Sequence, residues 1–178
     1  LQLTQNYYPS VGGGIRYKKE FADYFRSLGH RVDVLCINSE SEMSIEEKEG
    51  GTIYRTPNNF EFNSALISFK YFKWFKKLAP QYDMLHFNFP SPMPDMALVH
   101  YASILNEETL ISTYYHADIV SAKRFSGIYN YFYTHKFLEL QDKIFVSNPR
   151  IADSSPYLEK VKEKIKVLPF GIDLSKYK

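Results

Sequence analysis

The chain has 178 residues, of which 22 are Lys or Arg and 20 are Asp or Glu, so its formal net charge is +2. This length indicates one domain, and the balanced charge argues against a protein that binds nucleic acid through an overall basic surface. The single cysteine, Cys36, excludes an intrachain disulfide and a cysteine-rich zinc site, and no apolar run reaches the roughly 18 residues that a membrane-spanning helix needs.

Apolar spacing predicts that strands and helices alternate along the chain. Residues 39–51 interrupt this pattern because they are acidic and polar and end in glycine, so we expect a surface loop or a poorly ordered insertion there. Gly29 stands where a helix commonly ends. In chain order, we predict a strand at 1–5, a loop at 6–14, a helix between Gly14 and Gly29, strands at 32–37 and 52–55, a helix at 65–79, a strand at 84–89, a helix at 94–105, a strand at 110–115, a helix at 126–140, a strand at 143–146, a helix at 156–162 and a strand at 165–168.

This alternation is typical of parallel strand–helix–strand units with helices on both faces of the sheet. We therefore expect an α/β fold, a Rossmann-like three-layer sandwich with a mostly parallel sheet. Ligands of such sheets bind beyond the carboxyl ends of the strands. The loops expected to carry a site follow Gln5, Ile37, Phe87, Thr113 and Val146.

Three consecutive glycines, Gly12, Gly13 and Gly14, lie between the first predicted strand and the first predicted helix. Small residues there let a ligand approach the backbone, and the unpaired N–H groups of a helix N-terminus favour a phosphate or another anion. A dinucleotide-binding fingerprint needs a further glycine at position 17, which is Tyr17, so a dehydrogenase is not indicated. The alternative is a purely structural role, in a tight turn that requires a positive φ.

His116 and Asp118 follow the strand predicted at 110–115, at the expected ligand edge. A histidine and a carboxylate two residues apart can orient a hydroxyl group or exchange a proton, and the alternative is a loop histidine bonded to neighbouring backbone. His86 lies inside an apolar strand, so we expect a buried core histidine. His30 follows Gly29 on a turn and is expected to be structural.

The spacings of common metal and nucleophile motifs do not occur in the sequence. It contains no D-x-D, no pair of histidines at metalloprotease spacing and no G-x-S-x-G. We therefore expect no dedicated metal site, and we assign no role to the histidines of the predicted helices, His100 and His135.

The segment 69–77 combines phenylalanines and lysines at helical spacing. Phe69, Phe72 and Phe75 are expected to form its buried face. One interpretation is an ordinary core helix with a solvated basic face. The other is a surface that meets anionic lipid headgroups. The lysines concerned are Lys70, Lys73, Lys76 and Lys77.

A series of segments in this order resembles the motifs of family 4 glycosyltransferases, enzymes of the GT-B fold. The segments span nearly the whole chain, and it is their ordered set that carries the resemblance. The stretch His116-Ala117-Asp118-Ile119-Val120 is most similar to members described as mannosyl- or rhamnosyltransferases. The matching segments are 7–15, 28–35, 82–88, 114–120, 142–147 and 165–173.

The resemblance implies one half of a GT-B glycosyltransferase. In the family, two Rossmann-like domains face a cleft, the N-terminal one holding the acceptor and the C-terminal one holding the nucleotide-sugar donor. The Pro-x-Gly-Ile-Asp motif that ends the family's N-terminal domain occupies residues 169–173 here. Residues 1–178 are therefore expected to be a single N-terminal, acceptor-side domain, with the C-terminal donor-binding domain absent from this chain.

The resemblance also implies functional residues. His116 matches the family's loop histidine near the transferred sugar, and we expect it to be catalytic together with Asp118. The glycine pair lies near the donor diphosphate and the acceptor in the family. Asn88 departs from the pattern, since the family often has a histidine there. The substrate-binding positions expected are Tyr8, Gly13, Gly14, Arg16 and Asn88.

The expected function is transfer of a sugar, with retention of configuration, from a nucleotide-sugar to a glycan or lipid-linked acceptor in bacterial cell-surface polysaccharide synthesis. The resemblance implies no metal and no cofactor, and we expect no nucleic-acid partner. The expected location is the cytoplasm or the inner face of its membrane, with peripheral membrane contact, and the domain alone is expected to be inactive. The alternative, from another class, is a noncatalytic Rossmann-like module that binds a nucleotide or a sugar phosphate.

Overall fold

The computed structural model describes residues 1–119, 127 and 129–171. Within this part of the chain, one sheet has eight strands and a separate hairpin has two. The strands of the sheet are β1 (Gln2–Leu3), β2 (Val34–Ile37), β3 (Ser44–Lys48), β4 (Gly51–Thr56), β7 (Met84–Phe89), β8 (Leu110–Tyr115), β9 (Lys143–Val146) and β10 (Ile165–Val167), and those of the hairpin are β5 (Phe60–Phe62) and β6 (Ala65–Ile67). The helices are α1 (Gly13–Ser27), α2 (Phe69–Leu78), η1 (Ala79–Gln81), α3 (Pro92–Tyr101), η2 (Ala102–Ile104), the π-helix η3 (Asn130–Thr134), α5 (His135–Glu139), α6 (Pro149–Ser154) and η4 (Glu159–Lys164).

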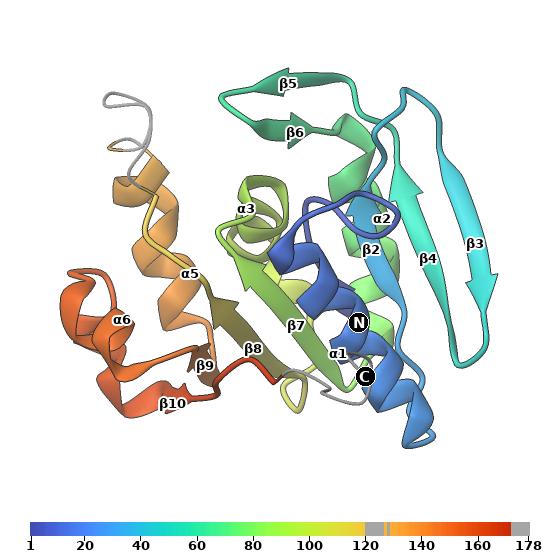
Figure 1. Cartoon of the computed structure of the whole chain (residues 1–178). Helices are drawn as coiled ribbons and strands as arrows, with labels where there is room; N and C mark the ends of the chain where they lie inside the picture. The colour runs from blue at the N-terminus through green and yellow to red at the C-terminus, as the bar shows by residue number, and fades with distance from the viewer. Residues whose placement is uncertain (120–126, 128, 172–178) are drawn as a thin grey trace.

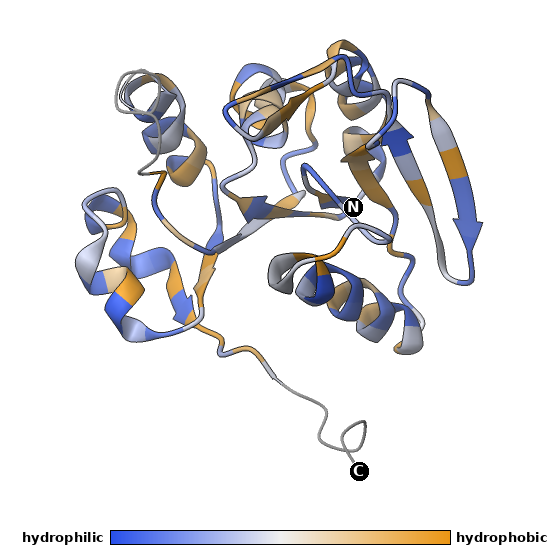
Figure 2. Cartoon of the chain, turned by 45° about the horizontal axis from the view of Figure 1, so that its top comes forward, coloured by the Kyte–Doolittle hydropathy of each residue, from blue (hydrophilic) through white to orange (hydrophobic). Residues whose placement is uncertain are grey.

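The sheet runs in the order β10-β9-β8-β7-β1-β2-β4-β3, and its neighbouring strands are parallel except for β3 and β4. α1 covers one face of the sheet, and α2, α3 and α5 cover the other (Figures 1 and 2). The expected three-layer α/β sandwich is confirmed. Parallel pairing also brings the carboxyl ends of β1, β7 and β8 to one edge, beside the start of α1.

The face of the sheet under α2, α3 and α5 is apolar. Leu3, Phe87 and Ile144 are fully buried there in a cluster that includes most of the large side chains of the core. Continuous apolar runs such as 84–89 are the pattern of strands enclosed on both sides. The predicted bounds of β7, β8 and β9 coincide with the observed ones for this reason.

The face under α1 is polar in its centre. Gln2, His86 and Ser112 lie next to one another on β1, β7 and β8, and all three are buried. His86 Nδ1 lies 2.9 Å from Ser112 Oγ, and its ring stacks on Phe21 of α1 with 4.2 Å between centroids. Burial lowers the pKa of His86 to about 3, so the ring is neutral. The expectation of a core histidine at position 86 is confirmed.

Gly29 follows the C-terminal end of α1, as predicted. Gly29 has φ 87°, its N–H donates to Arg26 O at 2.9 Å, and the N–H of His30 donates to Phe25 O at 3.1 Å. This pair of bonds is the Schellman arrangement, which favours glycine because of its left-handed backbone. His30 therefore has the structural place that the sequence predicts.

The expectation of a loop at 39–51 is wrong, since β3 occupies Ser44–Lys48 and pairs antiparallel with β4. Only Ile45 among the five residues of β3 is apolar, and it is exposed. Glu46 instead bonds Lys48 and Arg55. An edge strand that is solvated on both faces has the polar composition of a loop, so alternation of apolar residues cannot reveal it.

The helix predicted at 65–79 begins four residues later, because Ala65–Ile67 pairs with β5. Phe69 is 69% exposed and lies 6.0 Å from the ring of Phe60, so its expected burial is wrong. Tyr71, Phe75 and Leu78 form the buried face of α2 instead.

The remaining helices also differ from prediction at their ends. α3 begins at Pro92 and is followed by η2, while the helix predicted at 156–162 is replaced by α6 and η4. Proline fits the first helical turn, which explains the starts at Pro92 and Pro149. Of the helix predicted at 126–140, Ser126 and Ile128 lie outside the described residues, and η3 and α5 form its later part.

Candidate functional site

The loop after β1 carries the glycines and is anchored at its base. Tyr7 is 4% exposed and packs with Val34 and Cys36 of β2 in a second, smaller core cluster. Arg55 Nη2 donates a hydrogen bond to the carbonyl of Tyr8 at 2.8 Å. Residues 9–14 are exposed beyond these anchors. The loop is thus held at both anchors and presents its glycines to solvent.

Gly13 and Gly14 are the first residues of α1, and their φ angles lie outside the left-handed region. A Cβ atom added at either position would meet no other atom within 4 Å. A turn that requires positive φ therefore does not explain these two glycines. Their effect is to leave the N-terminus of α1 open, so that a ligand can reach its N–H groups.

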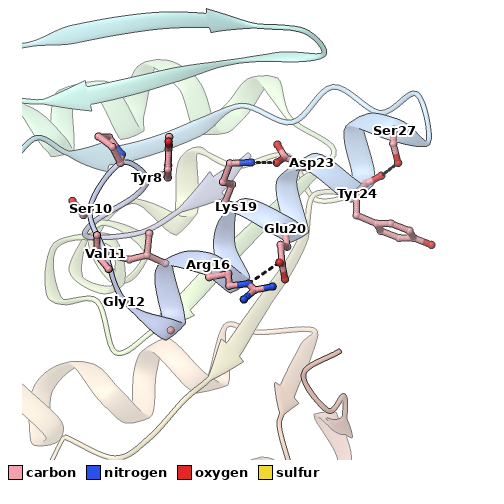
Figure 3. A pocket seen from close by; sticks show the side chains of 13 residues that line it. Tyr8, Ser10, Val11, Gly12, Arg16, Lys19, Glu20, Asp23, Tyr24 and Ser27 are labelled. Carbon is pink, nitrogen blue, oxygen red and sulfur yellow. Dashed lines mark hydrogen bonds and ion pairs between the residues drawn. The ribbon is translucent and has the colours of Figure 1, made fainter. Parts of the chain in front are cut away.

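The outer face of α1 and this loop line a pocket of about 990 Å³ that is open to solvent (Figure 3). Tyr8, Gly13 and Arg16, all expected to bind substrate, line it, and Gly14 adjoins it. Charged side chains follow along the helix, with Arg16 Nε 2.8 Å from Glu20 Oε1 and Lys19 Nζ 2.5 Å from Asp23 Oδ2. The pocket thus offers an aromatic ring and several hydrogen-bonding groups beside the glycines.

His116 lies immediately beyond β8, next to the carboxyl end of β7. The backbone N–H of His116 donates a hydrogen bond to Phe89 O at 3.0 Å. The ring nitrogen Nε2 is 3.5 Å from Asn88 Oδ1, at the outer limit of a hydrogen bond. Burial, and secondarily the charge of Lys18, lower the pKa of His116 to about 4. The imidazole is therefore neutral at physiological pH, with one nitrogen that donates and one that accepts.

Aromatic rings surround His116. Tyr17 of α1 and Tyr114 of β8 have centroids 5.9 Å and 4.9 Å from the imidazole, and Phe170 stacks on it at 6.0 Å. Phe170 also stacks on Tyr114 at 4.9 Å. The segment after β10 therefore lies against the histidine, although it is distant in sequence.

Asn88 is 1% exposed, and its Nδ2 has no hydrogen-bond partner within residues 1–119, 127 and 129–171. The hydroxyl of Tyr17, whose ring contacts the imidazole, also has no hydrogen-bond partner among these residues. Buried polar groups without partners are uncommon in folded proteins. Two such groups around one imidazole are consistent with a binding site in which a ligand supplies the missing hydrogen bonds.

Asp118 has a different environment from His116. Its Oδ1 accepts hydrogen bonds from the hydroxyl of Tyr115 and, at 2.7 Å, from Ser155 Oγ. In the part of the chain that the structure describes, no hydrogen bond joins Asp118 to His116. The carboxylate fastens the loop after β8 to the segment that follows α6.

Three residues of this region were not singled out from the sequence. Lys18 lies at 7% exposure on the inner face of α1, and Tyr17 and Phe170 contact His116. The signal for Lys18 was its spacing, because Ile15, Lys18 and Ala22 form the buried stripe of the helix. The contacts of Tyr17 and Phe170 depend on tertiary structure alone.

Among the described residues, no group of three or more His, Cys, Asp or Glu side chains is arranged to hold a metal ion. The same residues contain no helix that is both long and apolar enough to cross a membrane.

Residues 11–176 match the family model of Glycosyltransferase Family 4. The chain is 30% identical over 174 residues to O-antigen chain mannosyltransferase C of Escherichia coli, covering 97% of this chain and 46% of that protein. It is 26% identical over 178 residues to D-rhamnosyltransferase WbpZ of Pseudomonas aeruginosa, covering 99% of this chain and 45% of that protein. The chain thus spans slightly less than half the length of these relatives.

Solved structures share the fold at lower identity. Sucrose-phosphate synthase from Thermosynechococcus elongatus has a TM-score of 0.67 and 15% identity, with 98% of this chain and 48% of that chain covered. An alpha-glucosyltransferase in complex with UDP and a 13-mer DNA has a TM-score of 0.60 and 15% identity, with 98% and 43% covered. At these identities the likeness concerns the fold, and each solved chain continues well beyond the matched part.

Proposed function

Because the chain belongs to glycosyltransferase family 4, we propose that residues 1–178 form the N-terminal, acceptor-side domain of a retaining glycosyltransferase that uses a nucleotide-sugar donor. The observation that carries the proposal is the arrangement at the carboxyl edge of the sheet. There the open N-terminus of α1 and the neutral, enclosed His116 belong to neighbouring loops. A donor-binding domain in the rest of the intact enzyme would complete the site.

The proposed chemistry divides between these two parts. The leaving nucleoside diphosphate gains negative charge as the sugar departs, and the N–H groups at Gly13 and Gly14 are suited to stabilise it. The neutral imidazole of His116 can donate a hydrogen bond to a hydroxyl of the transferred sugar and so fix its orientation. Asn88 and Asp118 support this loop, one beside the imidazole and the other through Tyr115 and Ser155.

The acceptor is proposed to lie in the pocket along α1. Tyr8, which is 52% exposed, offers a ring face to a sugar, and Arg16 and its neighbours offer hydrogen bonds to hydroxyl groups. The name of the E. coli relative, an O-antigen chain mannosyltransferase, supports a glycan or lipid-linked acceptor of bacterial cell-surface polysaccharide synthesis. The proposed partners include no nucleic acid, although one protein of the same fold was solved with DNA.

A lipid-linked acceptor would place the domain in the cytoplasm, at the inner face of the membrane. α2 supports peripheral contact, because Lys70, Lys73, Lys76 and Lys77 are all exposed. Aromatic rings that could enter the headgroup region are exposed next to these lysines. They are Phe60 and Phe62 of the β5–β6 hairpin and Phe69 at the start of α2, whose ring contacts that of Phe60.

Sugar transfer by the intact enzyme and by the 178-residue chain tests the proposal. We expect transfer from a nucleotide-activated mannose or rhamnose by the intact enzyme and none by the chain alone. Turnover by the isolated chain would contradict the division into two domains. Nucleotide binding by the intact protein without transfer to any glycan acceptor would instead favour a noncatalytic module.

A further inference from the structure

Lys18 is a buried cation beside the candidate site. Its side chain is 7% exposed on the inner face of α1. Lysine is rarely buried this deeply unless a carboxylate pairs with it. Over the residues that the structure describes, no carboxylate oxygen lies within 4 Å of its Nζ. Burial lowers the pKa of Lys18 to about 8, so most molecules still carry the charge near pH 7.

The contacts of Lys18 reach the start of the loop that carries the glycines. Its Nζ donates to Asn6 Oδ1 at 3.0 Å and lies 3.4 Å from Asn6 O. The same carbonyl accepts a hydrogen bond from Thr4 Oγ1 at 3.2 Å. Asn6 follows β1 by three residues and precedes the glycines, and α1 begins at Gly13. The hydrogen bonds from Lys18 to Asn6 therefore hold the first part of the loop against α1.

The charge of Lys18 also acts on His116, whose other neighbours are uncharged. The side chains that face the imidazole are Tyr17 from α1, Asn88 from β7, Tyr114 from β8 and Phe170 from the segment after β10. Burial raises the pKa of both tyrosines, so neither is charged near neutral pH.

Among these surroundings, Lys18 supplies the positive charge that disfavours the imidazolium form of His116. The thiol of Cys36, also near Lys18, has a pKa that burial raises to about 12, so it brings no compensating negative charge.

We infer that Lys18 is a positioning residue of the site, which fixes the loop after β1 against α1 through Asn6 and presents a buried positive charge to His116. An apolar side chain at this position of the helix would fill the space without the cost of burying an ammonium group. The hydrogen bonds to Asn6 offset part of that cost and explain where the side chain points.

Nuclear magnetic resonance of the 178-residue chain tests both parts of the inference. Lys18→Met keeps the length of the side chain and removes its charge. We expect the titration midpoint of His116 to rise only in part, because burial, the larger cause of its low pKa, remains. We also expect the amide signals of residues 8–14 to shift. Lys18→Arg restores the charge and is expected to keep the low midpoint.

Asn6→Ala is the matched control, because it removes the side-chain acceptor and leaves the charge in place. We expect it to shift the loop signals while the midpoint of His116 stays low. An equal rise of the midpoint in Asn6→Ala and Lys18→Met would show that loosening of the loop, and not the charge, is responsible. Unchanged loop signals and an unchanged midpoint in a folded Lys18→Met chain would overturn the inference.

The same variants can be followed in the intact enzyme. The proposed role needs the neutral imidazole of His116, so activity falls at pH values below its pKa. Lys18→Met should raise that pKa and move the acidic limb of the pH profile of kcat/KM to higher pH, and Lys18→Arg should restore the profile. The measurements on the 178-residue chain need no sugar transfer. Their result therefore stands whether or not the proposed glycosyltransferase activity is found.

Discussion

The N–H of His116 donates a hydrogen bond to the carbonyl of Phe89 at 3.0 Å, which joins the first residue after β8 to the last residue of β7. The bond continues the parallel ladder by one residue beyond the end of β8. It places the imidazole beside Asn88 and under Phe170. Backbone pairing therefore determines the position of His116 without using its imidazole.

His116→Ala should lower kcat/KM of the intact enzyme by roughly 10²-fold or more, the scale for losing a positioned catalytic group. The melting temperature should change little, because the backbone bond to Phe89 does not need the ring. Steady-state kinetics together with a melting curve measure both effects. His100→Ala, on the exposed side of α3, is the control and should leave the kinetics as in wild type. Wild-type kinetics in His116→Ala would remove the residue from the site, and a collapsed melting temperature would assign it a structural role.

Gly14→Val should abolish transfer by the intact enzyme and leave the fold intact. Among the described residues, a Cβ at this position meets no atom within 4 Å, and the φ angle of Gly14 suits an L-residue, so we expect the fold to tolerate the substitution. The side chain would occupy the space above the N-terminus of α1 where the donor oxygens are proposed to bind. Gly14→Ala, which is smaller, should lose less activity. Full activity in a folded Gly14→Val enzyme would contradict the role of the loop.

Gly51→Ala should destabilise the fold without touching the site. A Cβ at this position would lie 2.1 Å from Val32 O and 2.9 Å from Asp33 Oδ1, closer than real Cβ atoms approach. The added Cβ would push β4 away from Val32 and Asp33, which should lower the free energy of unfolding by about 1–3 kcal/mol. Denaturant unfolding measures the loss, with Gly171→Ala as control because its added Cβ meets no atom within 4 Å. Equal stability of the two variants would show that the β2–β4 contact adjusts at no cost.

The stability of the chain should fall as the pH decreases from about 6.5 to 3, in part because of His86. In the folded chain its pKa is about 3, whereas the ordinary value is 6.5. Between these values His86 is protonated in the unfolded chain and stays neutral in the folded chain. The free energy of unfolding therefore decreases as the pH falls. Above 6.5 both states are neutral at this residue and its contribution is fully retained.

His86→Gln cannot take up this proton, so its melting temperature should depend less steeply on pH in that window. Ser112→Ala is the control, because it removes the partner of Nδ1 and leaves a buried histidine that still titrates. Melting curves of the three proteins between pH 3 and 7 measure the slopes. Parallel curves for wild type and His86→Gln would contradict the assignment.

The chain should sediment with anionic vesicles at low salt and be released at high salt. Each lysine near an anionic surface contributes about 1 kcal/mol, and salt screens this attraction. Replacing Lys70, Lys73, Lys76 and Lys77 together by Gln should abolish binding, while vesicles of neutral lipid should bind weakly. Equal sedimentation with neutral and anionic vesicles would rule out the charge of α2 as the cause.

The elements that could be predicted from the sequence are those whose burial leaves a pattern. Strands β7, β8 and β9 are enclosed on the apolar side and coincide with prediction, and Gly29 marks the end of α1. The ordered motifs likewise identified the family, which the match of residues 11–176 to its family model confirms. Strands without buried residues leave no pattern of apolar residues in the sequence. For this reason β3 and the β5–β6 hairpin were not predicted.

The sequence by itself thus determined the α/β alternation, the family and the positions of the glycine loop and His116. Tertiary structure alone decided that Lys18 is buried against Asn6, that Asp118 bonds Tyr115 and Ser155, and that Phe170 lies over His116. The physical reason is the distance along the sequence between the residues that make contact. Periodicity reports contacts within one helix or strand, whereas the charge, burial and partners of a side chain depend on segments that only the folded sheet brings together.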